Sequence, residues 1–116
     1  MSSDITTVVK KYIEIWNILD AAERRAAIGE LFTENVEYVD PNVAVEGQDA
    51  LDAYIAETQK QLPGSVFSLA GDVSTHHDLA RFTWQVGPAG GQPLAVGYDF
   101  AAVENGRVRR LYGFFS

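Results

Sequence analysis

A chain of 116 residues with a net charge of −7 has room for one folded domain and one hydrophobic core. Its hydrophobic fraction of 47% is well above that of disordered segments, and 16 acidic against 9 basic residues argue against surfaces for nucleic acid or anionic membranes, which need clustered cations. We therefore expect a single domain over residues 1–116, with no nucleic acid and no membrane as partner.

Two helices are expected first. Apolar residues recur at three- and four-residue steps from Ile5 to Leu19, which is typical of a helix with one apolar face. Asp20 is followed three residues later by Glu23, the spacing of a side chain that caps the start of a second helix. These residues predict a helical pair ahead of any strand.

One strand and a third helix should follow. Residues 35–40 alternate as a strand does and stop at Pro41, which cannot donate a hydrogen bond to a neighbouring strand. After a short extended piece, Gly47 opens a segment in which apolar residues from Leu51 to Leu62 recur at helical spacing. This third helix should end where the chain reaches a Pro-Gly pair.

From residue 66 onward the apolar pattern has a period of two, which predicts strands. The last two expected strands are joined by Asn105-Gly106, a strong hairpin signal. The four expected strands cover residues of about 66–76, 79–87, 94–103 and 107–115. Helices followed by an antiparallel meander predict an α+β fold, a curved sheet wrapped around three helices.

Two carboxylates fall on strand faces that should be buried. Asp40 is in phase with Tyr38, and Asp99 is in phase with Gly97, because alternate side chains of a strand share a face. Burying a carboxylate is costly unless it is paired or protonated. The pattern therefore predicts either ion pairs or a pocket that holds acid and base groups.

Both carboxylates also have a simpler interpretation. An aspartate before proline, as at Asp40, often accepts hydrogen bonds from nearby backbone amides in a turn. Asp99 could form an ion pair across the sheet with Arg81 or Arg109. In the absence of such a pair, its small and aromatic neighbours should push it towards the neutral, proton-donating form.

The opposite face of the strand around Asp99 is strongly apolar. Three helices cannot cover both faces of the sheet, so we expect a second copy of the chain to cover this one and form a homodimer. The residues expected on this face are Val96, Tyr98, Phe100, Tyr112 and Phe114.

Several short motifs occur here in the same order as in ketosteroid isomerases. The chain resembles that branch of the nuclear-transport-factor-2-like superfamily, which includes the SnoaL-like polyketide cyclases, over nearly its whole length. The motifs are Tyr12-Ile13-Glu14, Val39-Asp40-Pro41, Gly47, Asp99 and Gly106-Arg107-Val108.

The resemblance implies a cone-shaped α+β barrel with an apolar cavity and no cofactor. It implies that Asp40 acts as the base, with Tyr12 as a hydroxyl donor and Asp99 as a second donor. Proton abstraction next to a carbonyl needs an ionised carboxylate near the carbon and donors near the oxygen, where enolate charge develops. Phe32 stands where some of these isomerases carry a tyrosine that supports the oxyanion donor, so Tyr12 should lack that partner.

Large apolar side chains should line the cavity in such a fold and suit a small hydrophobic molecule, unless they only fill the core. Tyr12 itself could equally be a core residue. The expected lining residues are Trp16, Tyr38, Tyr54, Phe82, Trp84, Leu111 and Phe115.

These expectations favour an enzyme that moves a proton on a hydrophobic carbonyl compound through an enolate, with isomerisation, cyclisation or elimination as the outcome. One alternative is a non-catalytic module of the same fold that binds a hydrophobic ligand or dimerises. The other is an epoxide hydrolase of the limonene-epoxide type, which would need an arginine between two carboxylates. Arg81 is out of phase with the expected cavity face, which leaves Arg109.

Other kinds of site find little support. The absence of cysteine excludes disulfides, thiolate metal sites and a cysteine nucleophile, and it fits a reducing compartment. Together with the lack of a signal-peptide pattern, it makes the cytoplasm the expected location. His76 and His77 point to opposite strand faces and have no third ligand, so we expect no metal, although one of them could transfer a proton.

Overall fold

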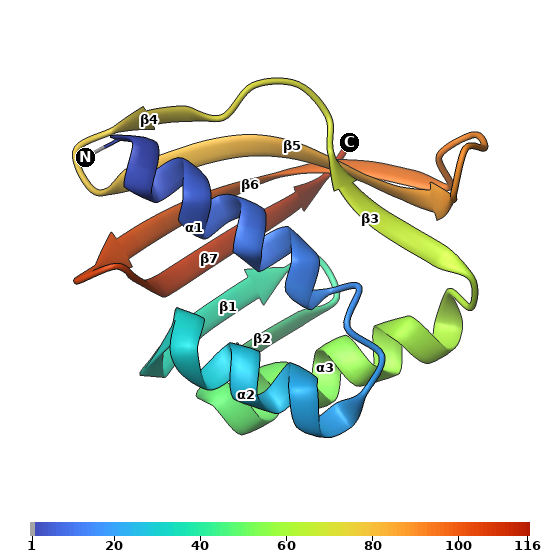
Figure 1. Ribbon diagram of the computed structural model, residues 1–116, viewed down its shortest axis with the longest axis horizontal. Coiled ribbons are helices and arrows are strands. Elements are labelled where there is room, and N and C mark those ends of the chain that lie inside the picture. Colours follow the sequence, from blue (N-terminus) through green and yellow to red (C-terminus); the bar gives the residue numbers. More distant parts are fainter. Residues whose placement is uncertain (1) are drawn as a thin grey trace.

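The computed structural model describes residues 2–116, with side chains from Ile5 onward. The described residues form three helices and seven strands, in the expected α+β order (Figure 1). They are α1 (Ser2–Ile15), α2 (Ala21–Leu31), β1 (Phe32–Asp40), β2 (Val43–Glu46), α3 (Gln48–Gln61), β3 (Ser65–Leu69), β4 (Ser74–His76), β5 (Leu79–Pro88), β6 (Ala95–Glu104) and β7 (Arg107–Phe115).

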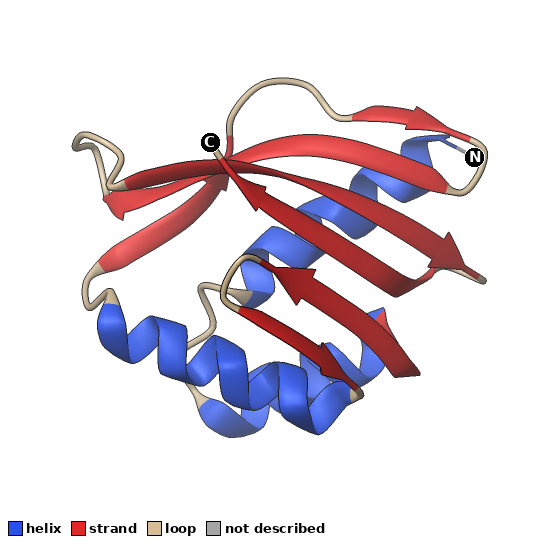
Figure 2. Cartoon of the chain, turned by 180° about the vertical axis from the view of Figure 1, so that it is seen from behind, coloured by secondary structure: helices blue, strands red, loops and turns tan. Residues whose placement is uncertain are grey.

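The strands form one curved, unclosed sheet. Its order is β2-β1-β7-β6-β5-β3, and the short β4 pairs with β5 beside β3. All neighbours run antiparallel except β1 and β7, which run parallel, so the sheet is mixed. The helices lie against one face of the sheet. The other face is not covered by any helix, as the view from behind shows (Figure 2).

The helices form where the sequence predicts them, with one difference at the end of α1. Tyr12 and other apolar residues of α1 are buried, but the helix ends at Ile15 and Leu19 lies beyond it, 77% exposed. The backbone turns at this point because Asp20 starts the next helix. Its carboxylate accepts a hydrogen bond of 2.9 Å from the backbone N–H of Glu23, the expected cap.

The expected strand over residues 66–76 is in fact two strands. β3 and β4 both pair with β5, and the chain between them leaves the sheet at Gly71, where φ is +95°. A positive φ is accessible to glycine at little cost, so this residue permits the break. The single-strand expectation was wrong because the alternation of apolar residues continues across it.

The two faces of β6 differ as the alternation predicts. Gly97, Asp99 and Ala101 are buried against the helices, and Tyr98 and Phe100 point to the uncovered side. Gly97 pairs directly with Trp84 on β5, and a Cβ at this glycine would lie 2.4 Å from the indole ring. The missing side chain therefore makes room for the indole over the sheet.

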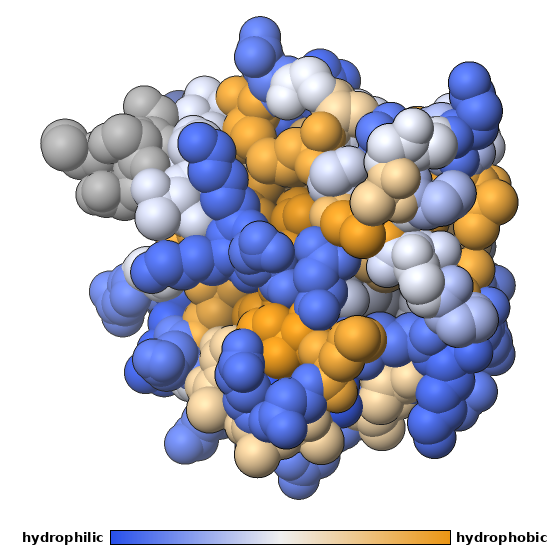
Figure 3. Space-filling model, turned by 45° about the vertical axis from the view of Figure 1, so that its right-hand side comes forward, coloured by the Kyte–Doolittle hydropathy of each residue, from blue (hydrophilic) through white to orange (hydrophobic). Residues whose placement is uncertain are grey.

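On the face drawn in Figure 3, hydrophilic side chains surround bands of hydrophobic ones that reach the surface. Among the described residues, every helix is too short or too polar to cross a lipid bilayer.

Candidate functional site

A cavity of about 440 Å³ opens between the concave face of the sheet and the helices α1 and α3. Of the expected site residues, Tyr12, Asp40 and Asp99 all line it, as do five of the seven expected apolar residues. The lining residues are Tyr12, Ile13, Trp16, Tyr38, Asp40, Asn42, Tyr54, Glu57, Thr58, Gln61, Leu62, Phe67, Trp84, Val86, Ala95, Asp99, Gly113 and Phe115.

Asp40 is a buried carboxylate that accepts four hydrogen bonds. Its Oδ1 accepts from the backbone N–H groups of Asn42 (2.8 Å) and Val43 (3.2 Å), and its Oδ2 accepts from the hydroxyls of Tyr38 (2.8 Å) and Tyr54 (2.7 Å). The turn after β1 thus supplies the amide contacts typical of aspartate before proline, while the other oxygen faces the cavity hydroxyls. Four donors suit an ionised carboxylate, which only accepts.

Asp99 is held differently. Only 4% of its surface is exposed, and its Oδ1 accepts a hydrogen bond of 3.0 Å from the indole Nε1 of Trp84. Burial raises the pKa of Asp99 to about 7, the hydrogen bonds from Trp84 and Tyr12 act in the opposite direction, and the charge of Asp40 adds to the increase. This carboxyl group therefore exchanges its proton near neutral pH.

The proposed ion pair of Asp99 with Arg81 or Arg109 is absent. The ion pairs among the described residues join Arg24, Arg25 and Arg110 to acidic partners, and none includes Asp99. Arginine is also missing from the described residues that line the cavity. The ion-pair interpretation of Asp99 was wrong because these side chains are on opposite faces of the sheet. Asp99 points to the face that carries the helices, whereas Arg81 and Arg109 line a groove on the outer face.

Gly113 brings the two carboxylates together, and the sequence analysis missed it. It pairs with Asp99 across β6 and β7, and its strand also pairs with β1. A Cβ at this position would lie 2.8 Å from Oδ1 of Asp99 and 3.4 Å from Cβ of Asp40. Only a residue without a side chain leaves that space open. The sequence pattern that could have identified Gly113 is a residue without a side chain in phase with Leu111 and Phe115, two residues expected to line the cavity.

Tyr12 is buried among other rings at the cavity wall. It packs edge-on against Trp16 (6.3 Å between ring centroids), Phe32 (6.0 Å) and Phe82 (5.9 Å). Burial raises the pKa of Tyr12 well above 10.0, and the charge of Asp99 raises it further. The hydroxyl therefore stays protonated and can donate. Phe32 adjoins Tyr12 and offers it no hydroxyl, but side-chain hydrogen bonds with Trp16 and Tyr38 partly offset the increase in the pKa of Tyr12. The expectation that Tyr12 lacks a supporting tyrosine was therefore wrong, because Tyr38 of β1 takes that place.

A belt of aromatic rings surrounds the rest of the cavity. Neighbouring rings in the belt have centroids between 5.1 and 6.2 Å apart. In order, its members are Tyr38, Tyr54, Trp16, Phe67, Trp84 and Phe115. Two expected lining residues, Phe82 and Leu111, are instead fully packed in the core. Phe67 lies within an expected strand but was not identified as a lining residue.

One polar row of α3 also faces the cavity. Glu57, Thr58 and Gln61 follow Tyr54 at three-, four- and seven-residue steps, so all four lie on one side of the helix. The Tyr54 hydroxyl holds Asp40, and burial raises the pKa of Tyr54 to about 12. Helical spacing could have identified this row, but apolar residues alone were considered as lining.

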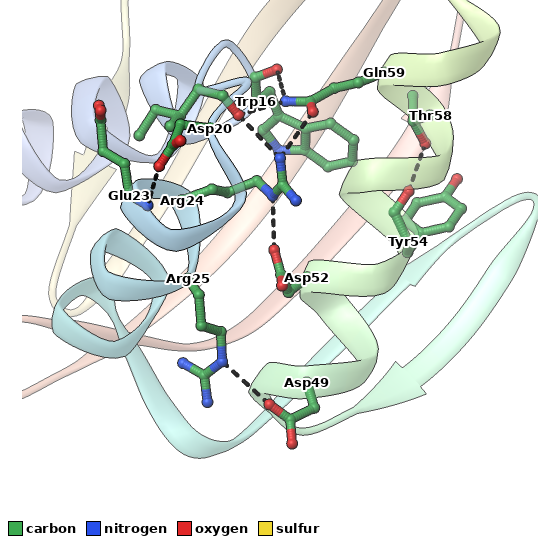
Figure 4. A network of polar contacts seen from close by, with 11 residues as sticks. Trp16, Asp20, Glu23, Arg24, Arg25, Asp49, Asp52, Tyr54, Thr58 and Gln59 are labelled. Carbon is green, nitrogen blue, oxygen red and sulfur yellow. Dashed lines mark hydrogen bonds and ion pairs between the residues drawn. The ribbon is translucent and has the colours of Figure 1, made fainter.

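A buried arginine fixes the helices that frame the cavity (Figure 4). Arg24 on α2 donates to Asp52 (2.7 Å) and Gln59 (3.0 Å) on α3 and to the backbone carbonyl of Ile18 (3.1 Å). Gln59 in turn donates to the carbonyls of Trp16 and Ile18. The network joins the end of α1 to α3, and so holds Trp16 opposite Tyr54.

His76 and His77 lie away from this cavity. His76 ends β4 and His77 lies in the turn to β5, where its φ is +52°; both are exposed, and neither lines the cavity. Their Nδ1 atoms are 3.2 Å apart, so the expectation that they point to opposite strand faces was wrong, because His77 has left the strand. A role for either as a proton-transfer group in this cavity therefore has no geometric support. Among the described residues, no group of three or more potential ligands could hold a metal ion.

Replacing Arg24 by methionine should lower the free energy of unfolding by about 3 kcal/mol, because Asp52 and Gln59 lose a buried partner. The adjacent Arg25→Met change removes an exposed pair with Asp49 and should cost less than about 1 kcal/mol. Urea unfolding of both variants measures the difference. Equal losses would contradict the assignment of the network as a structural clamp.

The pKa of Asp99 also predicts how stability depends on pH. With a pKa of about 7 in the fold against an ordinary 3.8, the folded state binds a proton that the unfolded state has released. The contribution of this group to stability therefore falls as pH rises from about 4 to 7 and stays low above that range. Asp99→Asn removes the charge, so it should gain stability relative to the parent protein over this range, by at most about 4 kcal/mol. Parallel curves of unfolding free energy from pH 5 to 8 would refute this.

The chain is similar to several proteins of the same fold. Residues 9–111 match the SnoaL-like domain family. A proposed isomerase of the SnoaL-like family from Agrobacterium tumefaciens is 32% identical, covers 100% of this chain and 99% of its own, and superimposes with a TM-score of 0.91. No curated protein sequence matches the chain.

Two more distant structures share the fold. A proposed ketosteroid isomerase from Kribbella flavida is 18% identical over 98% of this chain and 78% of its own, with a TM-score of 0.75. A proposed polyketide cyclase from Sinorhizobium meliloti is also 18% identical, over 97% of this chain and 98% of its own, with a TM-score of 0.75. The expected nuclear-transport-factor-2-like fold is confirmed, and the match over residues 9–111 shows that this chain belongs to the SnoaL-like family.

Proposed function

We propose that the protein is an enzyme that moves a proton on a hydrophobic carbonyl compound through an enolate. The observation that carries this proposal is the pair of buried carboxylates in one aromatic cavity, which have opposite surroundings. Asp40 is held by four donors, as suits the ionised form, whereas burial brings the pKa of Asp99 to about 7. Groups of opposite protonation state are what acid–base catalysis needs.

In the proposed reaction Asp40 takes the proton. Its Oδ1 is fixed by backbone amides, but the partners of Oδ2 are hydroxyls, which can rotate away. A C–H bond next to the substrate carbonyl gives its proton to Oδ2, its electron pair forms a C=C bond to the carbonyl carbon, and the π pair of the C=O bond moves to the oxygen. Tyr54 is the less buried of the two hydroxyl partners, so it is the one that moves aside.

Tyr12 and protonated Asp99 stabilise the enolate. Both groups line the cavity. At neutral pH Tyr12 is fully protonated and Asp99 is partly protonated, so each can donate a hydrogen bond to the developing oxyanion. Return of the proton to a different carbon gives an isomer. Attack of the enolate on a second carbonyl gives a ring, and loss of a neighbouring group gives an elimination product.

A non-catalytic hydrophobic-ligand module is the second candidate. The full set of donors on Asp40 favours it, because both oxygens of this carboxylate are already occupied by hydrogen bonds within the protein. An epoxide hydrolase is less well supported. It would need an arginine between the carboxylates, and the described lining residues include none.

Turnover of a simple β,γ-unsaturated ketone, followed by the absorbance of its conjugated product, tests the proposal. Asp40→Asn keeps the shape of the side chain and loses the base, so the rate should fall by about 10²-fold or more. Asp49→Asn, at a carboxylate that is 94% exposed, is the matched control and should keep the parent rate. An Asp40→Asn protein that is folded and equally active would contradict the role of Asp40. Ligand binding without any turnover would favour the binding module.

We also propose that two copies of the chain pair through the uncovered face of the sheet. Tyr98 and Phe114 stack there with centroids 5.4 Å apart, and Phe100 packs edge-on against both. These rings are 39–47% exposed, and no helix covers them (Figure 2). Exposed aromatic clusters of this kind are typical of interfaces.

The charges around this face favour a second copy as its occupant. Glu37 and Glu46 lie on β1 and β2, towards one edge of the sheet, and Arg81 lies on β5, towards the other. Arg110 on β7 approaches Glu37 at 3.9 Å, which leaves Glu46 as the acidic side chain of that edge without an ion pair in the described residues. A two-fold axis can therefore bring acidic side chains of one copy against basic side chains of the other. A surface that is complementary to itself is what a symmetric dimer requires.

Phe114→Lys should convert the dimer to a monomer, because it places a charge in the centre of the aromatic cluster. Leu19→Lys, at an exposed apolar residue away from this face, should leave the dimer intact. Sedimentation velocity at tens of micromolar distinguishes the two states. A monomeric parent protein, or equal effects of the two changes, would defeat the proposal.

A further inference from the structure

The cavity carries acidic groups and lacks a basic one. Asp40, Asp99 and Glu57 line it, and among the described lining residues there is no lysine, arginine or histidine. The donors that satisfy Asp40 are backbone amides and tyrosine hydroxyls, which are neutral. The negative charge in the cavity is therefore stabilised by hydrogen bonds but not neutralised by a cation.

Three arginines among the described residues are already paired with acidic side chains outside the cavity lining. Arg24 and Arg25 on α2 contact Asp52 and Asp49 on α3, and Arg110 on β7 approaches Glu37 at 3.9 Å. Arg24 is held by three hydrogen bonds in a buried network and cannot turn to the cavity without breaking them. A positive charge next to the two carboxylates would therefore have to come from a ligand.

The walls of the cavity suit such a ligand. The aromatic belt runs from Tyr38 to Phe115 and includes Trp16 and Trp84. Aromatic rings attract cations through the negative charge of their faces, most strongly in tryptophan and in sites that exclude water. Rings and carboxylates in one cavity are the combination that recognises alkylammonium groups.

We propose that the cavity takes a hydrophobic ligand that carries a positively charged amine, in preference to neutral and anionic analogues. The class of substrate would then be an amino-carbonyl compound. This inference rests on the proposed function, because the proposed function supplies the reacting carbonyl. A cationic nitrogen near the reacting carbon withdraws electron density and makes the C–H bond more acidic. It also offsets the negative charge that the enolate adds to a cavity with two carboxylates.

The preference should depend on pH through Asp99. The other titratable groups that line the cavity with Asp99 are Tyr12 from α1, Tyr38 and Asp40 from β1, and Tyr54 and Glu57 from α3, and of these Asp40 and Tyr12 act on Asp99 directly. Burial raises the pKa of each of the three tyrosines, so they stay neutral near pH 7. Loss of the Asp99 proton therefore adds one negative charge, which strengthens cation binding and leaves neutral ligands little affected.

Benzyltrimethylammonium and its uncharged isostere neopentylbenzene are suitable probes, because they differ in charge at nearly constant shape. The chain has two tryptophans, Trp16 and Trp84, and both line the cavity, so tryptophan fluorescence reports binding directly. At pH 8.5 and constant ionic strength, the cation should bind at least about tenfold more tightly than the isostere. The ratio should fall by about threefold or more at pH 5.5.

Two variants locate the effect. Asp99→Asn should remove most of the pH dependence of the ratio, and Asp49→Asn, on the far surface of α3, should keep it. Equal affinities for the two probes, no binding of either probe, or a preference that ignores both pH and Asp99→Asn would overturn the inference. The ketone assay uses a neutral substrate, so retained turnover in any of these cases would show that the proposed function stands and the amine preference alone has failed.

Discussion

The burial of two carboxylates beside one glycine is the constraint around which this molecule is organised. Asp40 and Asp99 lie on either side of the space that a side chain at Gly113 would fill. Each carboxylate would be costly to bury alone, and the chain stabilises them by different means. Asp40 receives two amides and two hydroxyls, whereas Asp99 receives an indole N–H and takes up a proton near neutral pH.

The rest of the fold serves this arrangement. The end of β1 and the turn after it supply Tyr38 and the amides, and α3 supplies Tyr54. Gly97 lets the indole of Trp84 lie against β6 and reach Asp99. The Arg24 network holds the end of α1 against α3, far enough from the sheet to leave a cavity of about 440 Å³. Because all three helices lie on the cavity side of the curved sheet, its outer aromatic face has no helix over it (Figure 2).

Alternation along single strands was enough to predict which carboxylates are buried, because side-chain direction in a strand is a local property. It placed Asp40 and Asp99 correctly. It could not show their partners, since Trp84 and Gly113 meet Asp99 only through the pairing of separate strands. The parallel pairing of β1 with β7 is non-local in the same way. Phe82 and Leu111 were assigned to the cavity because apolar side chains of core and pocket look alike in a sequence.

Asp99 is a carboxyl group that changes its protonation state near neutral pH beside a second buried carboxylate, Asp40. The most direct test is the titration of the Asp99 side-chain carboxyl carbon by ¹³C NMR, in the parent protein and in Asp40→Asn. The structure predicts a midpoint near 7 in the parent, and a lower one in the variant because the charge of Asp40 contributes to the increase. A midpoint near 4 in the parent protein, the ordinary range of aspartate, would contradict the account.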